Sequence, residues 1–455
     1  MKKITNISVI GLGKLGGSMA AAFAHRGFQV IGVDVNPAHV EAFNAGKAPV
    51  QETGLSEMIA ANQSRLRATL STEEAVMNSD ISFVIVPTPS DHRGAFTLQY
   101  ARYAFAQLGK ALKKKKAYHV IVMTSTVLPG SMRSGLLPIL EKESGLCCGP
   151  DFGLCYNPEF IALGSVIRDF LNPDFYLLGQ FDESSGDALE SVHQKVSQNQ
   201  APVRRMSLEN AELAKIAVNS FVTMKISFAN MLAEFCERIP FGDVDVVSDA
   251  LGMDKRIGRK YLTGGLGFAG PCFPRDNVAL AFVGQHLDVD VGLITENDSY
   301  NLRMPQRLIA RLRSLIPKQG TVAVLGLSYK PLSHIIECSF GVALAKALAD
   351  AGYRVKVHDR LALNEAKAVL EKCTLLTESL EQVLVDADVV LITTTDEPYR
   401  KIKAEDFNTK ERSVIVVDYW RALQHLKNAE NITYIAVGRN QGDTGYLKKL
   451  SDLWH

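Results

Sequence analysis

The chain has 455 residues, of which 47% are hydrophobic, and its formal net charge is +1. A chain of this length can bury two or three hydrophobic cores, and its balanced charge argues against nucleic acid or a membrane surface as a partner. The seven cysteines include no C-x-x-C pair, so they predict neither a metal site nor a disulfide framework. Glycines interrupt the apolar start too early for a signal peptide, and we expect no membrane span. These features predict a soluble, cytoplasmic protein.

The predicted strand 4–10 leads directly into a glycine-rich turn at 11–16, with the sequence GLGKLG. A helix is predicted at 18–26 and a second strand at 28–33, which ends at Asp34. Strand, G-x-G-x-x-G, helix, strand and acid in this order are typical of a dinucleotide-binding domain. A carboxylate at Asp34 would hold ribose hydroxyls and repel a 2′-phosphate, so NAD is expected rather than NADP. The expected cofactor contacts here are Gly11, Gly13, Lys14, Leu15 and Asp34.

Two later strands, predicted at 81–86 and 120–123, end in loops rich in hydroxyl groups. Loops at the carboxyl ends of the strands line the ligand crevice of an open α/β sheet. Thr88, Pro89 and Thr126 could therefore face the cofactor, although ordinary proline-bounded loops would have the same spacing. A turn at Asn157-Pro158 then places Glu159, which by itself resembles a surface carboxylate.

Apolar residues recur at helical spacing from 207 to 238 and predict one helix about 45 Å long. A helix of this length would connect two domains and leave apolar surface for a second subunit. Lys215 and Asn219 are four residues apart and share a face, so they could direct two donors at one oxygen. A solvated lysine and a surface asparagine are the alternative interpretation.

The segment 264–276 contains four glycines in its first seven residues and then a single cysteine, Cys272. Pro274 suits the first turn of a helix, which predicts that Cys272 lies at a helix N-terminus. The helix dipole and Arg275 would both favour the thiolate, and Asp276 would lie one turn away. The alternative is a buried, inert cysteine in a glycine-rich turn.

The last third of the chain repeats the first. The segments 321–328, 352–359 and 387–392 echo 7–13, 27–34 and 79–84. We therefore predict an α/β protein with two Rossmann-like doubly wound domains joined by a long central helix, and domain boundaries at 1–206, 207–300 and 301–455. The second fingerprint is broken, because Tyr329-Lys330-Pro331 stand where glycines would be.

Besides the fingerprint with Asp34, the chain carries Ser125-Thr126-Val127-x-Pro129-Gly130, Asn157-Pro158-Glu159-Phe160, Ala211-Glu212-Leu213-Ala214-Lys215-x-x-x-Asn219, Arg256-Ile257-Gly258, Gly267-Phe268-x-Gly270-x-Cys272-Phe273-x-x-Asp276, Tyr329-Lys330 and Asp418-x-x-Arg421. Together these motifs resemble the UDP-glucose/GDP-mannose dehydrogenase family over nearly the whole chain. The resemblance implies oxidation of the C6 hydroxyl of a nucleotide hexose to a carboxylate, with reduction of two NAD⁺. The cysteine would capture the intermediate aldehyde as a thiohemiacetal, and the thioester formed next would be hydrolysed.

The resemblance also implies roles for single residues. Cys272 would be the nucleophile, and Lys215 and Asn219 would stabilise the oxyanion. Asp276 would orient the lysine or a water, and Glu159 would be the base for thioester hydrolysis. Thr126 would position water, Cys272 and Arg275 would also touch the cofactor, and Arg256 would reach the neighbouring subunit's site in a homodimer or larger assembly. The expected substrate contacts are Glu159, Phe160, Lys215, Asn219, Arg256, Tyr261, Gly267, Phe268, Tyr329, Lys330 and Arg421.

Two departures from the family pattern stand out. Leu163 replaces a common glutamate, and Glu337-Cys338 replace an Arg-Glu pair. UDP-glucose, giving UDP-glucuronate, is the expected substrate; GDP-mannose, TDP-glucose and UDP-N-acetylhexosamines are alternatives. A β-hydroxyacid-type NAD dehydrogenase and a non-catalytic sensor of NAD or nucleotide sugars are more distant interpretations.

Overall fold

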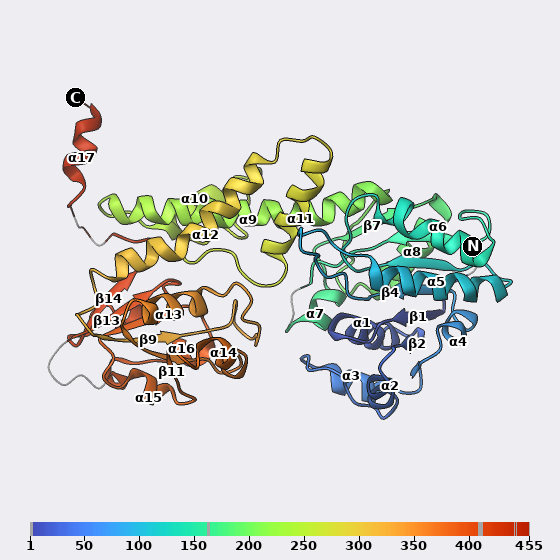
Figure 1. Cartoon of the computed structure of the whole chain (residues 1–455), viewed down its shortest axis with the longest axis horizontal. Coiled ribbons are helices and arrows are strands. Elements are labelled where there is room, and N and C mark those ends of the chain that lie inside the picture. Colours follow the sequence, from blue (N-terminus) through green and yellow to red (C-terminus); the bar gives the residue numbers. More distant parts are fainter. Residues whose placement is uncertain (1–2, 162–163, 408–412, 441, 443, 455) are drawn as a thin grey trace. The chain divides into compact units, whose positions relative to one another are not determined.

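Figure 1 shows the computed structural model, which describes residues 3–161, 164–407, 413–440, 442 and 444–454. The chain divides into two compact units, which we call unit 1 and unit 2. Unit 1 contains residues 1–218 and 282–288, and unit 2 contains 219–281 and 289–455. Leu163 lies outside the described residues, so the departure at that position stays a sequence observation.

Unit 1 is built on an eight-stranded sheet with the order β3-β2-β1-β4-β5-β6-β7-β8. Only the β6–β7 pair is antiparallel. Side chains alternate across each strand, so two apolar cores form, one on each face of the sheet; Ile7 and Val9 belong to one and Ile10 to the other. The strands are β1 (Asn6–Ile10), β2 (Gln29–Val33), β3 (Leu66–Thr69), β4 (Ile81–Val84), β5 (Val120–Met123), β6 (Gly153–Tyr156), β7 (Tyr176–Gln180) and β8 (Val203–Ser207).

The helices of unit 1 cover both faces of this sheet. The core that contains Ile7 packs against α1, α7 and α8, and the core that contains Ile10 packs against α4, α5 and α6. The helices are α1 (Lys14–His25), α2 (Pro37–Asn44), α3 (Leu55–Ala61), α4 (Thr72–Met77), α5 (Gln99–Lys114), the π-helix η1 (Ser131–Leu136), α6 (Leu137–Ser144), α7 (Val166–Leu171) and α8 (Glu183–Val196).

Unit 2 contains a six-stranded parallel sheet with the order β11-β10-β9-β12-β13-β14. Numbered from the start of this sheet, its six strands have the order 3-2-1-4-5-6, which is also the order of the first six strands of unit 1. This confirms the prediction of two doubly wound domains. The strands are β9 (Thr321–Leu325), β10 (Arg354–His358), β11 (Leu375–Leu376), β12 (Val389–Ile392), β13 (Val414–Asp418) and β14 (Ile432–Ala436).

The helices of unit 2 fall into two groups. Most of α9 (Leu208–Arg238), together with α10 (Val244–Met253), α12 (Gly292–Leu312) and most of α11 (Phe273–His286), precedes the second sheet. The others are α13 (Phe340–Asp350), α14 (Leu363–Leu370), α15 (Leu380–Leu384), α16 (Glu397–Arg400), α17 (Leu447–Ser451) and the 3₁₀ turns η2 (Ala404–Asp406), η3 (Gln424–Leu426) and η4 (Asp452–Trp454).

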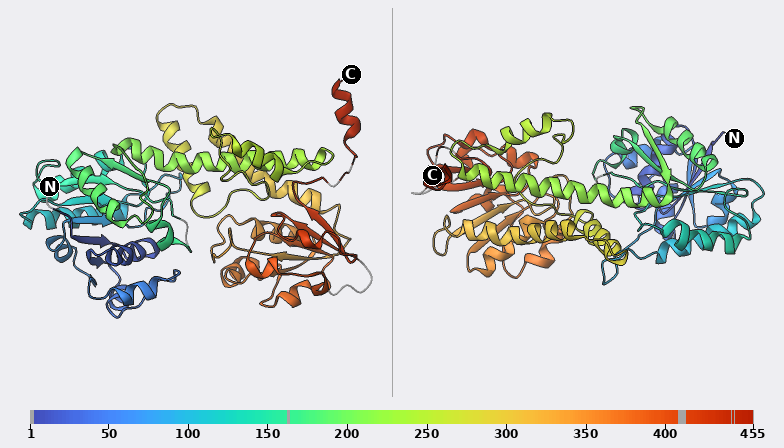
Figure 2. Two further views of the ribbon diagram at one scale, coloured as in Figure 1. Left: turned by 180° about the vertical axis from the view of Figure 1, so that it is seen from behind. Right: turned by 90° about the horizontal axis from the view of Figure 1, so that it is seen from above.

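Helix α9 is one unbroken helix, as predicted (Figure 2), and it has 31 residues. The boundary between the two units falls inside it, after Val218. Large apolar side chains are exposed along it, among them Phe221, Phe228 and Phe235. By length and composition, α9 could cross a membrane, and it is the one such helix among the described residues, whereas the sequence analysis expected no membrane span. The core helix of a soluble protein passes the same test of length and composition.

Candidate active site

A cavity of about 1080 Å³ lies in unit 1 along the glycine-rich turn. Gly11, Gly13, Lys14, Leu15 and Asp34 all line it, so the structure brings these predicted cofactor residues together. Helix α1 begins at Lys14, and its positive N-terminal end therefore lies at the cavity. A Cβ added at Gly13 would meet no atom within 4 Å, so the backbone is open to a ligand there. These features fit the pyrophosphate of a dinucleotide.

Asp34 is tied to the same turn by its carboxylate. One oxygen accepts a hydrogen bond from the Leu12 amide at 2.8 Å, and the other accepts from the Asn36 amide at 2.9 Å. The His39 ring lies 3.4 Å from the first oxygen. Each carboxylate oxygen has a second lone pair, so a fixed Asp34 can still accept from ribose hydroxyls.

The loops after β4 and β5 are joined by hydroxyl groups. The Thr88 hydroxyl donates to the Thr126 carbonyl at 2.7 Å, and the Ser125 hydroxyl donates to the Val86 carbonyl at 2.6 Å. Thr88 is buried and Pro89 is exposed, while Val86 lines the cofactor cavity. The Thr88 side chain therefore holds the two loops together, and its contact with the cofactor, like those of Pro89 and Thr126, stays a prediction.

Glu159, Phe160 and Lys215 form one cluster in unit 1. The Lys215 ammonium donates to the Glu159 carbonyl at 2.6 Å and lies 4.4 Å from the centre of the Phe160 ring. Lys215 is only 6% exposed, which excludes the solvated lysine that the sequence left as an alternative. A buried ammonium held by a carbonyl and an aromatic face is preorganised to face a developing negative charge.

The carboxyl group of Glu159 has an unusual environment. Its Oε1 atom is buried and has no hydrogen-bond partner among the residues that the structure describes. Burial raises the pKa of Glu159 to about 8, although the nearby Lys215 ammonium opposes the shift. A carboxyl with a pKa near neutrality can both take and return a proton, as a general base requires.

Glu212 supports this cluster, and the sequence analysis did not assign it a role. Its two carboxylate oxygens accept from the Gly130 and Met132 amides at 2.6 and 2.7 Å, and burial raises its pKa to about 7. It lies on α9 one turn before Lys215 and therefore ties this helix to the loop after β5. The Glu-x-x-Lys spacing was visible in the sequence, but the tertiary partner was not.

The cysteine loop lies in unit 2, and Cys272 is exposed directly before α11. The Asp276 amide donates to the Cys272 carbonyl at 2.8 Å, so the cysteine takes the position predicted for it at the helix N-terminus. Burial lowers the pKa of Arg275, while Asp276 and Cys272 oppose that shift. The dipole of α11 and the Arg275 cation both favour the thiolate form of Cys272.

Two asparagines that the sequence analysis did not single out clamp the glycine-rich part of the loop. Asn230 on α9 accepts from the Gly265 amide at 2.7 Å and donates to the Leu266 carbonyl at 3.0 Å. Asn301 on α12 makes the same pair of bonds with the Phe268 amide and carbonyl, each at 3.0 Å. A Cβ added at Gly267 would collide with the Asn301 side chain, so this glycine is required for the clamp.

Asn219 and Asp276 form a pair in unit 2. The Asn219 amide donates to an Asp276 carboxylate oxygen at 2.6 Å, and Asp276 is only 4% exposed. Asp276 therefore orients Asn219, a contact that the sequence analysis did not propose, since it assigned Asp276 to the lysine or a water. An amide held in this way keeps its second N–H in a fixed direction.

Tyr329 and Lys330 lie on the loop after β9, which packs against the cysteine loop. The Gly270 amide donates to the Glu337 carbonyl at 2.9 Å, and a Cβ added at Gly270 would meet the Tyr329 ring. The Lys330 ammonium lies 5.6 Å from the centre of that ring. Burial, with smaller effects of Cys272 and Glu337, raises the pKa of Tyr329 to about 12, so its hydroxyl stays protonated.

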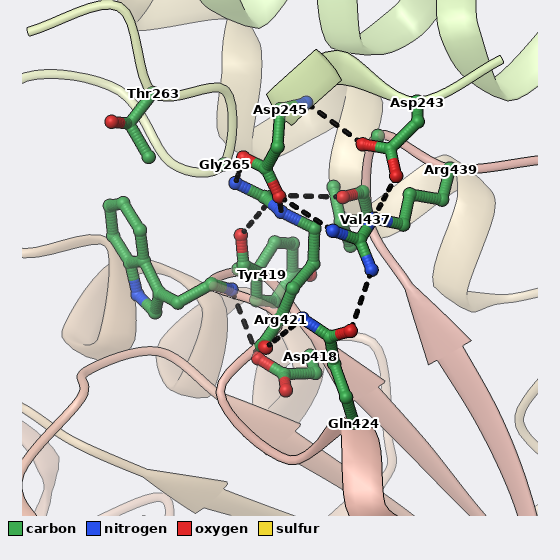
Figure 3. Close-up of polar contacts among 12 residues, drawn as sticks. Asp243, Asp245, Thr263, Gly265, Asp418, Tyr419, Arg421, Gln424, Val437 and Arg439 are labelled. Carbon is green, nitrogen blue, oxygen red and sulfur yellow. Dashed lines mark hydrogen bonds and ion pairs between the residues drawn. The ribbon is translucent and has the colours of Figure 1, made fainter. Parts of the chain in front are cut away.

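Arg421 is buried in a network of polar contacts, with a side chain only 2% exposed (Figure 3). Its guanidinium donates to both carboxylate oxygens of Asp245 at 2.7 and 3.0 Å, and to the Tyr419 and Val437 carbonyls at 3.1 and 2.8 Å. Arg439 also donates to Asp245, at 2.9 Å. Arg421 thus fastens α10 to the second sheet, and its contact with a nucleotide stays a prediction.

Arg256 and Tyr261 lie on the exposed segment between α10 and α11. The Arg256 side chain is 88% exposed and forms an ion pair with Asp254 at 2.6 Å. Tyr261 is half exposed and packs edge-on against the Phe273 ring, with 6.2 Å between ring centres. No group of three potential metal ligands occurs among the described residues, and none of the seven cysteines, all of which are described, forms a disulfide.

A dinucleotide cavity in one Rossmann domain, a second domain of the same order and a cysteine at a helix N-terminus define an NAD-dependent dehydrogenase with two Rossmann-like domains. Three models of one family match the chain: the NAD binding domain over residues 5–197, the central domain over 209–303 and the UDP binding domain over 323–425. The chain belongs to the UDP-glucose/GDP-mannose dehydrogenase family. It is a nucleotide-sugar dehydrogenase that uses NAD, as the motifs predicted.

Relatives of known function differ in the sugar that their names state. The chain is 32% identical to the UDP-glucose 6-dehydrogenase AglM of Haloferax volcanii over 90% of its own length and 95% of the relative's. It is 31% identical to a GDP-mannose 6-dehydrogenase of Azotobacter vinelandii over 91% of its own length and 96% of the relative's. A solved UDP-glucose dehydrogenase of Pyrobaculum islandicum superposes with a TM-score of 0.83, at 34% identity over 96% and 98% of the two chains.

Proposed function

We propose that this protein oxidises the C6 hydroxyl of UDP-glucose to a carboxylate, giving UDP-glucuronate with reduction of two NAD⁺. The observation that carries the proposal is the exposed Cys272 at the N-terminus of α11, together with the buried Asp276 in the first turn of α11, which holds the half-buried Asn219 of α9. An exposed thiol at a helix N-terminus can add to an aldehyde, which a single alcohol oxidation does not require. Bound NAD⁺ would accept the hydride in each oxidation.

In this mechanism the chain's own residues act on the sugar carbon. The Cys272 thiolate adds to the aldehyde and forms a thiohemiacetal, whose oxidation leaves a thioester. Lys215 and Asn219 donate to the oxygen that becomes negative in each tetrahedral state. Asp276 holds Asn219 in place. Glu159, with its raised pKa, takes a proton from the water that hydrolyses the thioester, and Thr126 positions that water.

The nucleotide would be bound by the second Rossmann-like domain. Lys330 would supply a cation for its phosphates. The sugar and the base would be contacted by Tyr261, Tyr329, Gly267 and Phe268. Arg421 would complete the nucleotide contacts from its fixed position. The ranges of the three family models support a working division at 1–206, 207–300 and 301–455.

The choice of UDP-glucose can be tested by measuring NADH released per sugar consumed across UDP-glucose, GDP-mannose, TDP-glucose and UDP-N-acetylhexosamines. We expect two NADH per UDP-glucose and much slower reaction with the others. Preferred turnover of GDP-mannose, which the similarity to GDP-mannose dehydrogenases favours as the second candidate, would replace the proposed substrate. One NADH per substrate would contradict the thioester route, and binding without turnover would support a sensor.

We also propose that the protein works as a homodimer or larger assembly in the cytoplasm. The exposed apolar side chains of α9 and the almost fully exposed Arg256 support the assembly, and seven cysteines without a disulfide support a reducing compartment. Mixing Arg256→Ala, which should bind the sugar nucleotide weakly, with Cys272→Ala tests it, at a substrate concentration at which neither variant alone turns over. If Arg256 serves the neighbouring subunit's site, mixed dimers should restore about a quarter of the activity. No recovery on mixing would place Arg256 outside that site.

A further inference from the structure

Four polar side chains on three helices of unit 2 form a network directly behind the Asn219–Asp276 pair. Thr223 lies on α9, Asn277 on α11, and Asn297 and Asp298 on α12. The Asn277 amide donates to the Thr223 hydroxyl at 3.0 Å and to an Asp298 carboxylate oxygen at 2.6 Å. The Asn297 amide donates to the same hydroxyl at 2.9 Å.

The centre of this network is buried and its hydrogen-bonding capacity is used. Thr223 and Asn277 are both 0% exposed. The Thr223 hydroxyl accepts from two amides and donates to the Ser220 carbonyl at 2.7 Å, which exhausts its one donor and two acceptor positions. Both N–H groups of Asn277 are likewise used. The Thr223 hydroxyl also lies 3.3 Å from the Asn277 carbonyl oxygen. A buried network of this kind resists distortion, because each broken bond leaves an unpaired group in a medium of low dielectric constant.

The network repeats the contact of the Asn219–Asp276 pair one step further along the same helices. Thr223 lies one turn after Asn219 on α9, and Asn277 directly follows Asp276 on α11. Two successive polar contacts therefore join α9 to the first turn of α11. The second contact limits rotation and sliding of that turn, whereas an apolar pair would fill the space without setting a direction.

We propose that Thr223 and Asn277 are positioning residues for the oxyanion site: they fix the first turn of α11 so that Asp276 holds the Asn219 amide toward the reacting oxygen. The inference rests on the proposed function. It assigns no contact with substrate to Thr223 or Asn277, and it places their effect on the chemical steps, where charge develops on oxygen.

The test is a double-mutant cycle between Thr223→Val and Asn219→Ala. For each variant, kcat, KM and the melting temperature are measured. Valine keeps the shape of threonine but removes the hydroxyl, so two buried amides lose their acceptor. We expect Thr223→Val to lower kcat about tenfold with KM changed less than about twofold, and Thr223→Ser to restore most of the rate. In the Asn219→Ala background the same substitution should have almost no effect on kcat, because its target has been removed.

A matched control removes another buried hydroxyl with two partners. Ser82 on β4 is 0% exposed and bonds to Ser8 at 2.6 Å and to the His119 ring at 2.7 Å. Ser82→Ala should lower the melting temperature as Thr223→Val does, with kcat unchanged. Should Thr223→Val fail to fold, Asn277→Ser takes its place in the cycle.

The outcomes separate this inference from the proposed function. A wild-type protein that makes no NADH from any nucleotide sugar contradicts the proposed function. If the wild type is active, the positioning role is contradicted when Thr223→Val lowers kcat by the same factor in the wild-type and the Asn219→Ala backgrounds. A rise in KM at constant kcat, or a Thr223→Ser variant no faster than Thr223→Val, also overturns it.

Discussion

The two Rossmann-like domains begin in the same way and then differ in one loop. The first strand of each ends at a glycine with positive φ, Gly11 at 100° and Gly326 at 111°. The following helix of each needs a glycine, Gly16 or Gly341, because an added Cβ would collide with the carbonyl of the first glycine. Five positions separate the glycines in unit 1 (16 − 11) and fifteen in unit 2 (341 − 326), so the second domain carries ten additional residues.

The broken fingerprint of unit 2 is therefore an interrupted one, since Gly341 occupies the place of the third glycine. The inserted loop carries Tyr329 and Lys330 and contacts the cysteine loop at Gly270. The acid at the end of the second strand also changes its use. Asp359 is 4% exposed and accepts four backbone amides, those of Leu327, Ser328, Leu361 and Ala362.

The same arrangement of strand, glycine and helix thus occurs in the domain that matches the NAD binding model and in the domain that matches the UDP binding model. In unit 1 the short turn leaves a cavity at the helix N-terminus, and Asp34 lies at its wall. In unit 2 the insertion lies between Gly326 and Gly341, and the buried Asp359 accepts from amides that precede and follow it in the chain, those of Leu327, Ser328, Leu361 and Ala362. The domain order is kept because the glycine contacts that pack helix against strand lie outside the insertion.

The largest expected effect is on catalysis by the cysteine loop of unit 2, compared with binding of NAD⁺ by unit 1. Cys272→Ala should lower uronate formation by at least about a thousandfold, because no thioester can form, while the affinity for NAD⁺ should fall far less, because the cavity of unit 1 keeps all its lining residues. Cys338→Ser, on the inserted loop, is the matched control and should keep its activity. Uronate formation at the normal rate in Cys272→Ala would assign the second oxidation to another mechanism.

The next effect concerns Glu159, to which the proposed mechanism assigns hydrolysis of the thioester. Hydrolysis should rise with pH toward about 8, where Glu159 becomes ionised. Glu159→Gln should slow it about a hundredfold at pH 8 and abolish the rise. Rapid mixing should show a burst of about two NADH per site, and mass spectrometry should find sugar on Cys272. A burst without an adduct would contradict the role of Glu159 in hydrolysis.

A pair of substitutions tests the two acids directly. Asp359→Ala leaves four backbone amides without their acceptor and should destabilise unit 2 by about 4 kcal/mol or more. Asp34→Ala should raise KM for NAD⁺ about tenfold, with a smaller loss of stability because it removes two amide contacts. Urea unfolding and initial rates measure both. Equal losses of stability would remove the distinction between the two acids.

The smallest effect compares buried histidines. Burial lowers the pKa of His193 in unit 1 to about 3, whereas the pKa of His358 in unit 2 is lowered less, since Asp359 and a backbone bond oppose burial. When the folded state lowers the pKa of a histidine, the unfolded state takes up the proton first. The protein therefore loses stability as the pH falls below the unfolded pKa of about 6.5. Relative to wild type, His193→Gln should therefore gain stability between pH 6.5 and 4, and His358→Gln should gain less. Parallel pH profiles for the two variants would contradict this.

The sequence by itself determined the two doubly wound domains, the helix between them and the NAD turn. These features follow from local periodicity and from glycines whose neighbours along the chain set their geometry, as at residues 11–16. The cysteine at a helix N-terminus was also predictable, because Pro274 and the run after it are local signals. The resemblance of separated motifs, rather than any single one, indicated the family.

Only the tertiary structure decided what the polar side chains contact. It pairs Asn219 with Asp276, buries Arg421 against Asp245, and shows that Glu159 is buried enough to hold its proton near neutral pH. It also shows that Gly341 completes the second fingerprint across an insertion. Hydrogen-bond partners and desolvation depend on residues far apart in the chain, and no spacing along the sequence records which of them meet.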